Sequence, residues 1–486
     1  MSRARLESTA DVAVIALVAR LAVTIHAHAE PVWDGFYYDL GARRIAAGLG
    51  YSEDLVIAGA GGVERVVWQP WAHYPVGYSG FLALFYRVLG DGTMVAALAN
   101  ALTGAALAAI VHRLALRAFE SERRALVAGL LVALHPGLVL YSGALMTEPL
   151  AATLTLLSVL LALEERVSAW IGAGVALGLA TLVRPNAILM APFLGLLAAG
   201  GRPFDELRRR ASSTLVRTTS RAVVVGAVAL ATVAPWTWRN CRVMDACAFV
   251  STNAGWNLVI GSAPGATGKF EFLVGNTPKG GPTCDEGGQV AQDRCWSRYG
   301  VATIRRDLGR WLSLVPAKLH YTLDAEWFPI NYLREARPDL VSAATHVAIG
   351  KGLTAAQHAL VFAAALAAIG WSRPHRTNRR AWVTQTALLL AVLALATRCL
   401  DPREPSVWPL AVIACVLPFV PLPGAPRRTG AELGVAALIL TTLATHAIFF
   451  GEDRYHLVAT PAFALLAAGI GRRAPDRHEL HGSLRA

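Results

Sequence analysis

Charged residues are scarce in this chain. Only 16% of its 486 residues are Asp, Glu, Lys or Arg, whereas soluble proteins usually carry about 25%. This deficit excludes an ordinary water-soluble protein. Together with 55% hydrophobic residues and many apolar runs of about 18–20 residues, it indicates a protein that crosses a membrane many times. Nucleic-acid motifs are lacking too, so we assign the net charge of +12 to loops facing anionic lipid.

The sequence also lacks a clear signal-peptide cleavage site and any Cys-x-x-Cys spacing. We therefore expect the first apolar run, residues 12–29, to be retained as the first span, and the absent spacing disfavours a zinc site. Four of the six cysteines fall in one long hydrophilic loop, which we place outside the cell. They are compatible with two disulfides in any of three pairings, or with unpaired thiols. These four are Cys241, Cys247, Cys284 and Cys295.

The apolar runs predict an all-α polytopic membrane protein with about 12 transmembrane helices. The spans lie at about 12–29, 93–116, 125–144, 150–163, 169–183, 187–199, 222–236, 353–369, 381–396, 407–420, 431–449 and 457–470. Two amphipathic stretches in the first outer loop are expected to be helices at the membrane surface. We divide the chain into an N-terminal transmembrane catalytic module (1–238), a small external subdomain (239–352), C-terminal transmembrane helices (353–471) and a cytoplasmic tail (472–486).

Arginine-rich loops set the predicted orientation. They follow the second, sixth, eighth and twelfth spans, and the loop 201–221 alone holds six arginines. Such loops stay in the cytoplasm, so both termini are expected there, with the protein in the inner (plasma) membrane. The external face then carries the first outer loop, the Glu148 turn, the Arg184 turn, the cysteine-rich region and the turn 451–456.

Ionisable residues gather at the span ends of this external face, where rigid helices would hold them in place. A carboxylate there can take a proton from an acceptor hydroxyl, and arginine or histidine can neutralise a departing phosphate. The combination fits transfer of a group from a phosphorylated lipid. The acidic members are Asp34, Asp39, Glu148, Glu452 and Asp453, and the others are Arg184, Arg239, Arg454, His73 and His456.

Several motifs, in this order, resemble the lipid-linked-sugar glycosyltransferases of the GT-C class. The chain is most similar to the bacterial branch related to dolichyl-phosphate-mannose protein mannosyltransferases and to the aminoarabinose transferase of lipid A. The resemblance runs from about residue 12 to 470. Its motifs are WDGFYYDLGARRIAAGLGY (33–51), HYPVGYSGFLALFYRVLG (73–90), MTEP (146–149), LVRPN (182–186), PWTWRN (235–240), STNAGWNL (251–258), GSAPGATG (261–268) and DRYH (453–456).

The resemblance implies roles by position. It makes Asp34 the general base or a metal-contacting carboxylate, and Glu148 the second outer-loop acid. Many relatives carry two adjacent acids in the first loop, whereas here Gly35 follows Asp34. A divalent cation at Asp34 and Glu148 is left open as a cofactor. The residues expected to bind substrate or phosphate are Arg184, Arg239, Arg454, His456, His73 and Tyr455.

Each of these residues also has a purely structural interpretation. Asp34 could cap the amphipathic helix that follows it, and Glu148 could be an ordinary first-turn helix acid. Arg184 could reach to lipid headgroups, and His73 could pack between its aromatic neighbours. Arg454 and His456 could anchor the chain at the membrane interface.

We predict an inverting membrane glycosyltransferase of the hexosyl or pentosyl type. It would take a sugar from a polyprenyl-phosphate donor and pass it to a hydroxyl of a lipid, glycan or protein. The first alternative is a transporter or flippase of envelope lipids, which would use charges within spans and internal repeats. We find no convincing repeat, and the spans hold few charges, mainly Arg20 and His112–Arg113. A non-catalytic membrane protein that binds a partner is the second alternative.

Overall fold

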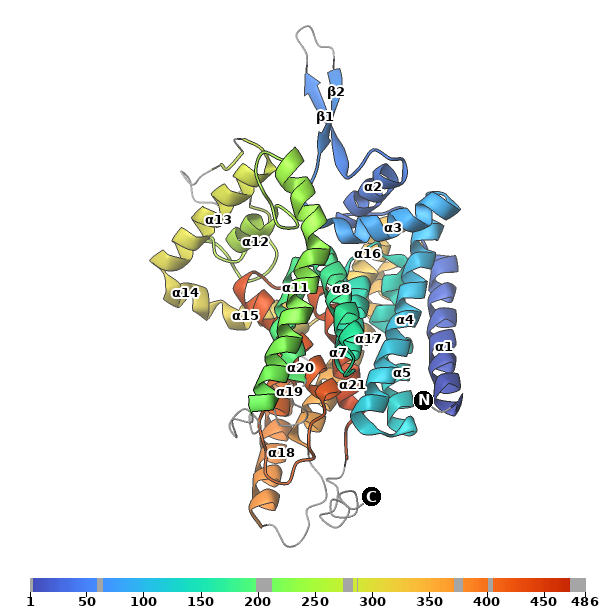
Figure 1. The fold of residues 1–486 in the computed structure, drawn as a ribbon, viewed down its shortest axis with the longest axis vertical. Coiled ribbons are helices and arrows are strands. Elements are labelled where there is room, and N and C mark those ends of the chain that lie inside the picture. Colours follow the sequence, from blue (N-terminus) through green and yellow to red (C-terminus); the bar gives the residue numbers. More distant parts are fainter. Residues whose placement is uncertain are drawn as a thin grey trace.

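The computed structural model of the protein describes residues 3–58, 64–197, 212–273, 283–285, 287–370, 379–400 and 405–472. Over these ranges the chain is almost wholly helical, with one two-stranded hairpin. Most of the long helices run along the longest axis, and the shorter helices α2 and α3 and the hairpin stand at one end (Figure 1). The predicted helical membrane fold is therefore confirmed.

Six helices in the described residues are long and apolar enough to cross a membrane, or seven if one bent pair counts as a span. The other predicted spans are helical but shorter, so all twelve apolar segments form helix while five of them fall short of a full crossing. The six are α1 (Arg3–Ala27), α4 (Thr93–Phe119), α11 (Ser212–Val243), α17 (Ala343–Ile369), α18 (Arg379–Cys399) and α20 (Gly430–Ile448). The bent pair is α5 (Glu122–Ala133) with α6 (Pro136–Leu140) and η1 (Tyr141–Gly143), and the shorter set is α7 (Glu148–Ala162), α8 (Val167–Val183), η2 (Pro185–Met190) with α9 (Ala191–Leu196), α19 (Trp408–Val416) with η4 (Leu417–Phe419), and η5 (Tyr455–Val458) with α21 (Thr460–Ala467).

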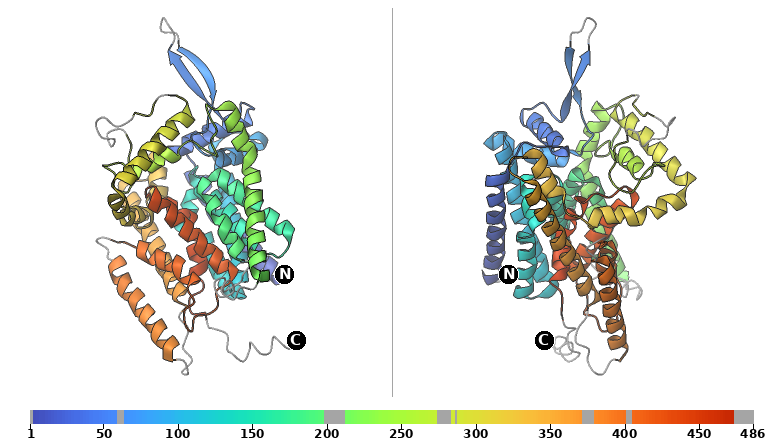
Figure 2. Two further views of the ribbon diagram at one scale, coloured as in Figure 1. Left: turned by 60° about the vertical axis from the view of Figure 1, so that its left-hand side comes forward. Right: turned by 180° about the vertical axis from the view of Figure 1, so that it is seen from behind.

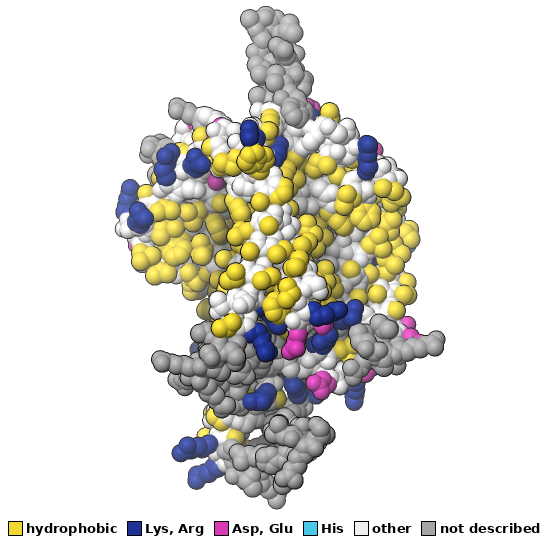
Figure 3. Space-filling model, viewed as in Figure 1, with side chains coloured by type: hydrophobic (Ala, Val, Ile, Leu, Met, Phe, Trp, Pro, Cys, Tyr) yellow, Lys and Arg dark blue, Asp and Glu magenta, His cyan; other side chains and the backbone are white. Residues whose placement is uncertain are grey.

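The bundle shows a hydrophobic surface to its surroundings. Figure 3 shows a broad band of hydrophobic side chains around the middle of one face, bordered below by a group of Lys and Arg side chains. Inside, small residues let helices approach closely. A Cβ atom at Gly178 of α8 would lie 2.5 Å from the Cβ of Thr232 of α11, so this contact requires glycine.

Arg20 is the charge inside the first span, and the structure explains it as a cap. Its guanidinium donates to the carbonyls of Val132 and Ala133, at 3.1 and 2.9 Å. These carbonyls lie at the end of α5, where the chain bends by 50° and the helical hydrogen bonds stop. The side chain fits because it crosses Gly104 of α4, where a Cβ would lie 2.0 Å from the Arg20 Nε.

The first outer loop combines two predicted helices with an element that the sequence analysis missed. Helices α2 (Asp34–Ala46) and α3 (Val76–Leu89) pack together, as expected for the two amphipathic stretches. Between them, β1 (Ser52–Ala58) and β2 (Glu64–Pro70) form an antiparallel hairpin in the register Ser52↔Pro70. The glycine-rich stretch 59–62 between the strands lies outside the described residues. β-branched residues on both sides of that stretch were a usable strand signal.

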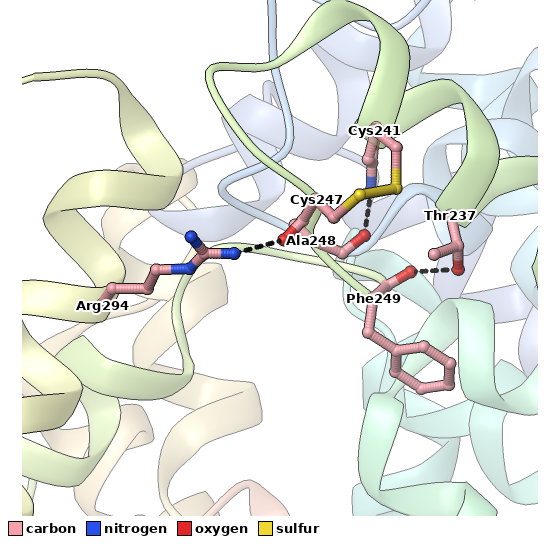
Figure 4. The surroundings of a disulfide bond; sticks show 7 residues. Thr237, Cys241, Cys247, Ala248, Phe249 and Arg294 are labelled. Carbon is pink, nitrogen blue, oxygen red and sulfur yellow. Dashed lines mark hydrogen bonds between the residues drawn. A yellow bond between two sulfur atoms is a disulfide. The ribbon is translucent and has the colours of Figure 1, made fainter.

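The external subdomain is a group of short helices beside the bundle (Figure 2). It comprises α12 (Ala254–Ile260), α13 (Gln289–Arg306), α14 (Leu308–Ser313), α15 (Val315–Leu323) and α16 (Phe328–Ala336). The four loop cysteines form the pairs Cys241–Cys247 and Cys284–Cys295. Around the first pair, Arg294 of α13 donates to the Cys247 carbonyl at 3.3 Å, which ties the end of α11 to the subdomain (Figure 4).

The start of α1 and the end of α21 lie at the same end of the bundle. Ser8 donates to Glu122 at the start of α5, and Arg124 of α5 donates to the carbonyls of Ala468 and Ile470, both at 2.8 Å. The hairpin is at the opposite end (Figure 1). Most of the predicted arginine-rich loop 201–221, and the loop and tail arginines at 373, 376 and beyond 472, lie outside the described residues.

Candidate functional site

Four chain segments bring ionisable side chains together at the end of the bundle opposite the start of α1. Asp34 begins α2, Glu148 begins α7, Arg184 follows the last residue of α8, and Arg454 lies between α20 and η5. The sequence places these residues at span ends, and the fold gathers the ends. Asp34, Arg184 and Arg454 remain partly exposed, with 21%, 16% and 13% of each side chain accessible.

The carboxylate of Asp34 accepts two hydrogen bonds. Arg454 Nη1 donates to one oxygen at 2.6 Å, and the Tyr74 hydroxyl donates to the other at 2.7 Å. Burial alone would raise the pKa of Asp34, but the charge of Arg454 and these hydrogen bonds outweigh it and lower the pKa below its usual value. Asp34 is therefore ionised at neutral pH, and its side chain makes no helix cap.

The backbone around Asp34 is tightly constrained. Trp33, just before it, has a φ of 53°, which is unusual for a residue with a side chain. Its indole packs against Phe328 and Tyr332 of α16, with ring centroids 5.3 and 5.7 Å away. On the other side, a Cβ at Gly35 would lie 2.5 Å from the Tyr332 hydroxyl. The position where relatives carry a second acid thus has no room here for a side chain.

Glu148 and Arg184 form the second carboxylate–guanidinium pair. Arg184 Nη1 donates to Glu148 Oε1 at 2.6 Å and contacts the Thr147 hydroxyl at 3.3 Å. Only 1% of the Glu148 side chain is exposed, and its Oε2 has no hydrogen-bond partner. One oxygen is thus held while the other is left for a further donor.

Tyr455 joins the two pairs. The guanidinium carbons of Arg184 and Arg454 each lie 5.1 Å from the centroid of its ring, within the range of cation–π attraction. The ring itself stacks on His446 of α20, with centroids 4.1 Å apart. Two arginines are therefore presented side by side, each with one carboxylate partner.

Glu452 is a third carboxylate in this group. Its Oε2 accepts from Arg454 Nε at 2.5 Å. Burial, reinforced by the nearby charges of Asp453 and Asp34 and opposed by Arg454, raises the pKa of Glu452 to about 7. The net charge around Arg454 therefore changes near neutral pH.

Two of the predicted phosphate-binding residues, His456 and Arg239, lie elsewhere. His456 is fully buried, with Nδ1 2.8 Å from the Thr322 carbonyl and Nε2 3.7 Å from Glu326, so its predicted contact with a phosphate does not fit its position. Arg239 donates to the carbonyls of Tyr51 and Trp71 at 2.5 and 3.0 Å. It holds the base of the hairpin, and the prediction of phosphate binding by Arg239 is corrected accordingly.

His73 lies beside the Asp34 group without joining its hydrogen bonds. Its ring meets Tyr74 edge-on, with centroids 4.9 Å apart. Burial lowers the pKa of His73, although the charge of Asp34 acts against this effect. A neutral imidazole at neutral pH does not suit the predicted contact with phosphate.

Tyr74 was not predicted from the sequence, and Glu452 was grouped with the external acids without a role in the site. Tyr74 holds Asp34, and Glu452 shares Arg454 with it. A detectable signal was available for Glu452, because it stands two residues before Arg454 in the same short turn. Nothing in the sequence indicates that the Tyr74 hydroxyl points to a residue forty positions earlier.

The two predicted metal-contacting carboxylates are each held by an arginine. No group of three or more His, Cys, Asp or Glu side chains within the described ranges is arranged to hold a metal ion. Both oxygens of Asp34 already accept hydrogen bonds, from Arg454 and Tyr74, and one oxygen of Glu148 accepts from Arg184, so these carboxylates as they lie do not form a metal centre. The divalent cation stays an untested prediction, and no step below depends on one.

Comparison with known proteins supports the predicted family. Residues 73–238 match the family described as dolichyl-phosphate-mannose-protein mannosyltransferase, which confirms the predicted resemblance for that segment. No curated protein matches the chain.

Solved structures with similarity to the chain include the oligosaccharyltransferase of Archaeoglobus fulgidus in its apo form, with 14% identity and a TM-score of 0.42 over 98% of this chain and 57% of that one. The same archaeon's oligosaccharyltransferase AglB, in complex with an inhibitory peptide and a dolichol-phosphate, gives 12% and 0.39 over 96% and 50%. ArnT from Cupriavidus metallidurans bound to undecaprenyl phosphate gives 15% and 0.36 over 96% and 77%. The chain spans about half the length of the archaeal enzymes.

Proposed function

We propose that this protein is a membrane glycosyltransferase. It takes a sugar from a polyprenyl-phosphate donor and transfers it to a hydroxyl of a lipid, glycan or protein on the external face. It resides in the inner (plasma) membrane with both termini in the cytoplasm. The observation that carries the proposal is the pair of carboxylate–guanidinium contacts, Asp34–Arg454 and Glu148–Arg184, whose two arginines both contact the ring of Tyr455.

The two arginines suit the phosphate of the donor. A polyprenyl phosphate monoester leaves as an anion, and guanidinium groups bind phosphate oxygens in a planar, bidentate manner. Arg184 and Arg454 already face one ring, so a phosphate in front of Tyr455 would be within reach of both. Negative charge that develops on the leaving oxygen is thereby neutralised where it forms.

Asp34 suits the acceptor. In a single inverting displacement, the acceptor oxygen forms its bond to the anomeric carbon while the bond from that carbon to the phosphate oxygen breaks. The acceptor hydroxyl loses its proton to the carboxylate of Asp34, and the bonding electron pair leaves with the phosphate. Glu148 keeps Arg184 in place, and its unpartnered Oε2 can accept from an acceptor hydroxyl.

The Asp34–Arg454 contact couples the two halves of the reaction. In the free protein, Arg454 lowers the pKa of Asp34, so that Asp34 is a weak base. When a donor phosphate draws the guanidinium away, Asp34 loses the charge and the hydrogen bond of Arg454 that lower its pKa, and the pKa of Asp34 rises. The base therefore becomes stronger only when a donor is bound, which protects the donor-free site from unproductive proton exchange.

The transporter alternative rested on charge inside the spans. Arg20, the main example, donates to backbone carbonyls at the bend after α5, which is a structural role.

The favoured proposal is tested by Asp34→Asn in membranes supplied with labelled polyprenyl-phosphate sugar, with Asp54→Asn as the control. Asp54 forms a similar pair with Arg44 at 3.1 Å but lies on the hairpin. Undiminished transfer by Asp34→Asn would refute the role of Asp34.

A further inference from the structure

A cavity in the external subdomain is the most distinctive feature that the proposed reaction does not use. It has a volume of about 200 Å³ and lies between α12, α13 and the segment that begins at His73 in the first outer loop. Its size suits one small ring rather than a lipid chain. The lining residues that matter here are His73, Thr252, Trp256, Gln292, Asp293 and Trp296.

Aromatic rings form one side of the cavity. Trp256 of α12 and Trp296 of α13 meet edge to face, with ring centroids 5.8 Å apart and an interplanar angle of 88°. This arrangement leaves the two indoles at right angles. Indole faces offer apolar surface next to polar groups, and sugar rings have a C–H face that packs on such surface and hydroxyls at their edge.

Polar groups complete the wall. Thr252 is buried, with 4% of its surface exposed, and its hydroxyl has no hydrogen-bond partner. Buried hydroxyls are nearly always partnered, and Thr252 lies in the wall of the cavity, where a water or a hydroxyl of an occupant can partner it. Gln292 uses its amide nitrogen on the carbonyls of Asp285 and Gly287, which leaves its amide oxygen as an acceptor. Asp293 accepts from the Gly255 N–H at 2.7 Å.

The charge of the wall selects against anions. Its described lining includes the carboxylates of Asp285 and Asp293 and neither Lys nor Arg. A phosphate or an acidic sugar would therefore be repelled by negative charge in this cavity, whereas Arg184 and Arg454 would attract it. The occupant favoured by this wall is an uncharged sugar ring.

The cavity adjoins the proposed base. His73 lines it, the next residue is Tyr74, and the Tyr74 hydroxyl donates to Asp34 at 2.7 Å. A ring held between the tryptophans and His73 is thus one side chain away from the group that would deprotonate an acceptor. We propose that this cavity binds a neutral sugar residue of the acceptor, which makes the acceptor a glycan. That the bound sugar belongs to the acceptor rests on the proposed function, whereas the binding of a sugar ring does not.

Ligand-observed saturation-transfer NMR on the full chain in detergent micelles tests the proposal. The probes are the methyl glycosides of glucose, mannose, galactose and arabinose, with inorganic phosphate as the anionic comparison. At least one glycoside should bind the wild-type protein, and phosphate should not compete with it. Thr252→Val removes one hydroxyl at nearly constant volume, and the loss of one hydrogen bond should weaken binding roughly three- to tenfold. Trp256→Leu should abolish it.

Matched controls separate the cavity from the rest of the protein. Thr303→Val removes a hydroxyl of α13 that donates to the Tyr299 carbonyl at 3.0 Å, and Trp382→Leu removes an exposed indole on α18. Both should bind glycoside as the wild type does. If Trp256→Leu does not fold, as judged by its melting temperature, Thr252→Val decides.

Three results would overturn the proposal: no glycoside binding at all, binding that Thr252→Val and Trp256→Leu leave unchanged, or competition by phosphate. Asp34→Asn should bind glycoside normally while losing transfer, so the two proposals fail separately. Glycoside binding without any transfer by the wild type counts against the glycosyltransferase and leaves the sugar site in place.

Discussion

The contact between Arg454 and Asp34 makes a prediction that concerns mechanism as well as rate. Arg454→Gln removes the guanidinium that bonds Asp34 at 2.6 Å and Glu452 at 2.5 Å. If Arg454 stabilises the leaving phosphate, transfer should fall roughly a hundred- to thousandfold, the usual effect of losing one such donor. Two partly buried carboxylates would also lose their cation, so some loss of stability is expected.

The pH dependence carries the sharper information. Asp34 acts in its deprotonated form, so kcat/KM falls as pH drops through its pKa in the free enzyme. In the wild type this acid limb lies low because Arg454 lowers the pKa of Asp34. In Arg454→Gln, Asp34 loses the charge and the hydrogen bond that lower its pKa. The pKa of Asp34 should therefore rise, and the acid limb should move to higher pH. Arg454→Lys keeps a charge and should move the limb less.

The assay is transfer from labelled polyprenyl-phosphate sugar in isolated membranes, measured across pH at low donor concentration. Arg337→Gln is the control, because Arg337 pairs with Asp339 on the surface at 3.1 Å and should change neither rate nor limb. An acid limb that stays in place in Arg454→Gln, or moves to lower pH, would contradict the coupling between donor binding and base strength.

Three further outcomes are expected. Burial raises the pKa of Glu452 to about 7, so above that pH its ionised carboxylate should compete with the donor phosphate for Arg454 and raise the KM for the donor. Glu452→Gln should keep that KM low on both sides of neutrality. A pH dependence of KM that the substitution leaves unchanged would contradict this. Gly35→Ala should impair transfer and lower the melting temperature, because its Cβ meets the Tyr332 hydroxyl, whereas Gly80→Ala, with nothing within 4 Å of the added atom, should not; equal behaviour of the two variants would argue against the packing. Arg20→Met should lower the melting temperature by leaving carbonyls at the α5 bend unpaired, at a cost of roughly 1–3 kcal/mol for each, and a melting temperature equal to that of the wild type would show that the cap contributes little.

Much of the fold could be predicted from hydropathy, since every predicted apolar segment forms helix. The predicted bounds already made several of these segments too short for a full crossing. Prolines mark where the short helical pieces begin, since Pro185, Pro192, Pro409 and Pro461 all stand in first turns. The hairpin was missed because its two seven-residue strands flank a glycine-rich stretch, and no strand was predicted on either side of it. Its β-branched residues gave the evidence, but no hydrophobic core marked which face they would cover.

The sequence indicated which residues belong to the site, but not the contacts that they make with one another. Asp34, Glu148, Arg184 and Arg454 were chosen because they stand at span ends, and the fold brings these ends together. Whether an arginine meets a carboxylate or a carbonyl depends on the segment that lies opposite, which the sequence does not reveal. Arg239 illustrates this, as its guanidinium serves the backbone of Tyr51 and Trp71.

The two disulfides have a practical consequence for work with this protein. Cys284 and Cys295 close a loop beside the two tryptophans, and Cys241 with Cys247 fixes the turn after α11. Dithiothreitol in a purification buffer would cut both crosslinks and free the segments they restrain. Preparations made with and without reductant therefore have to be treated as different samples, and production in an oxidising compartment is the sounder choice.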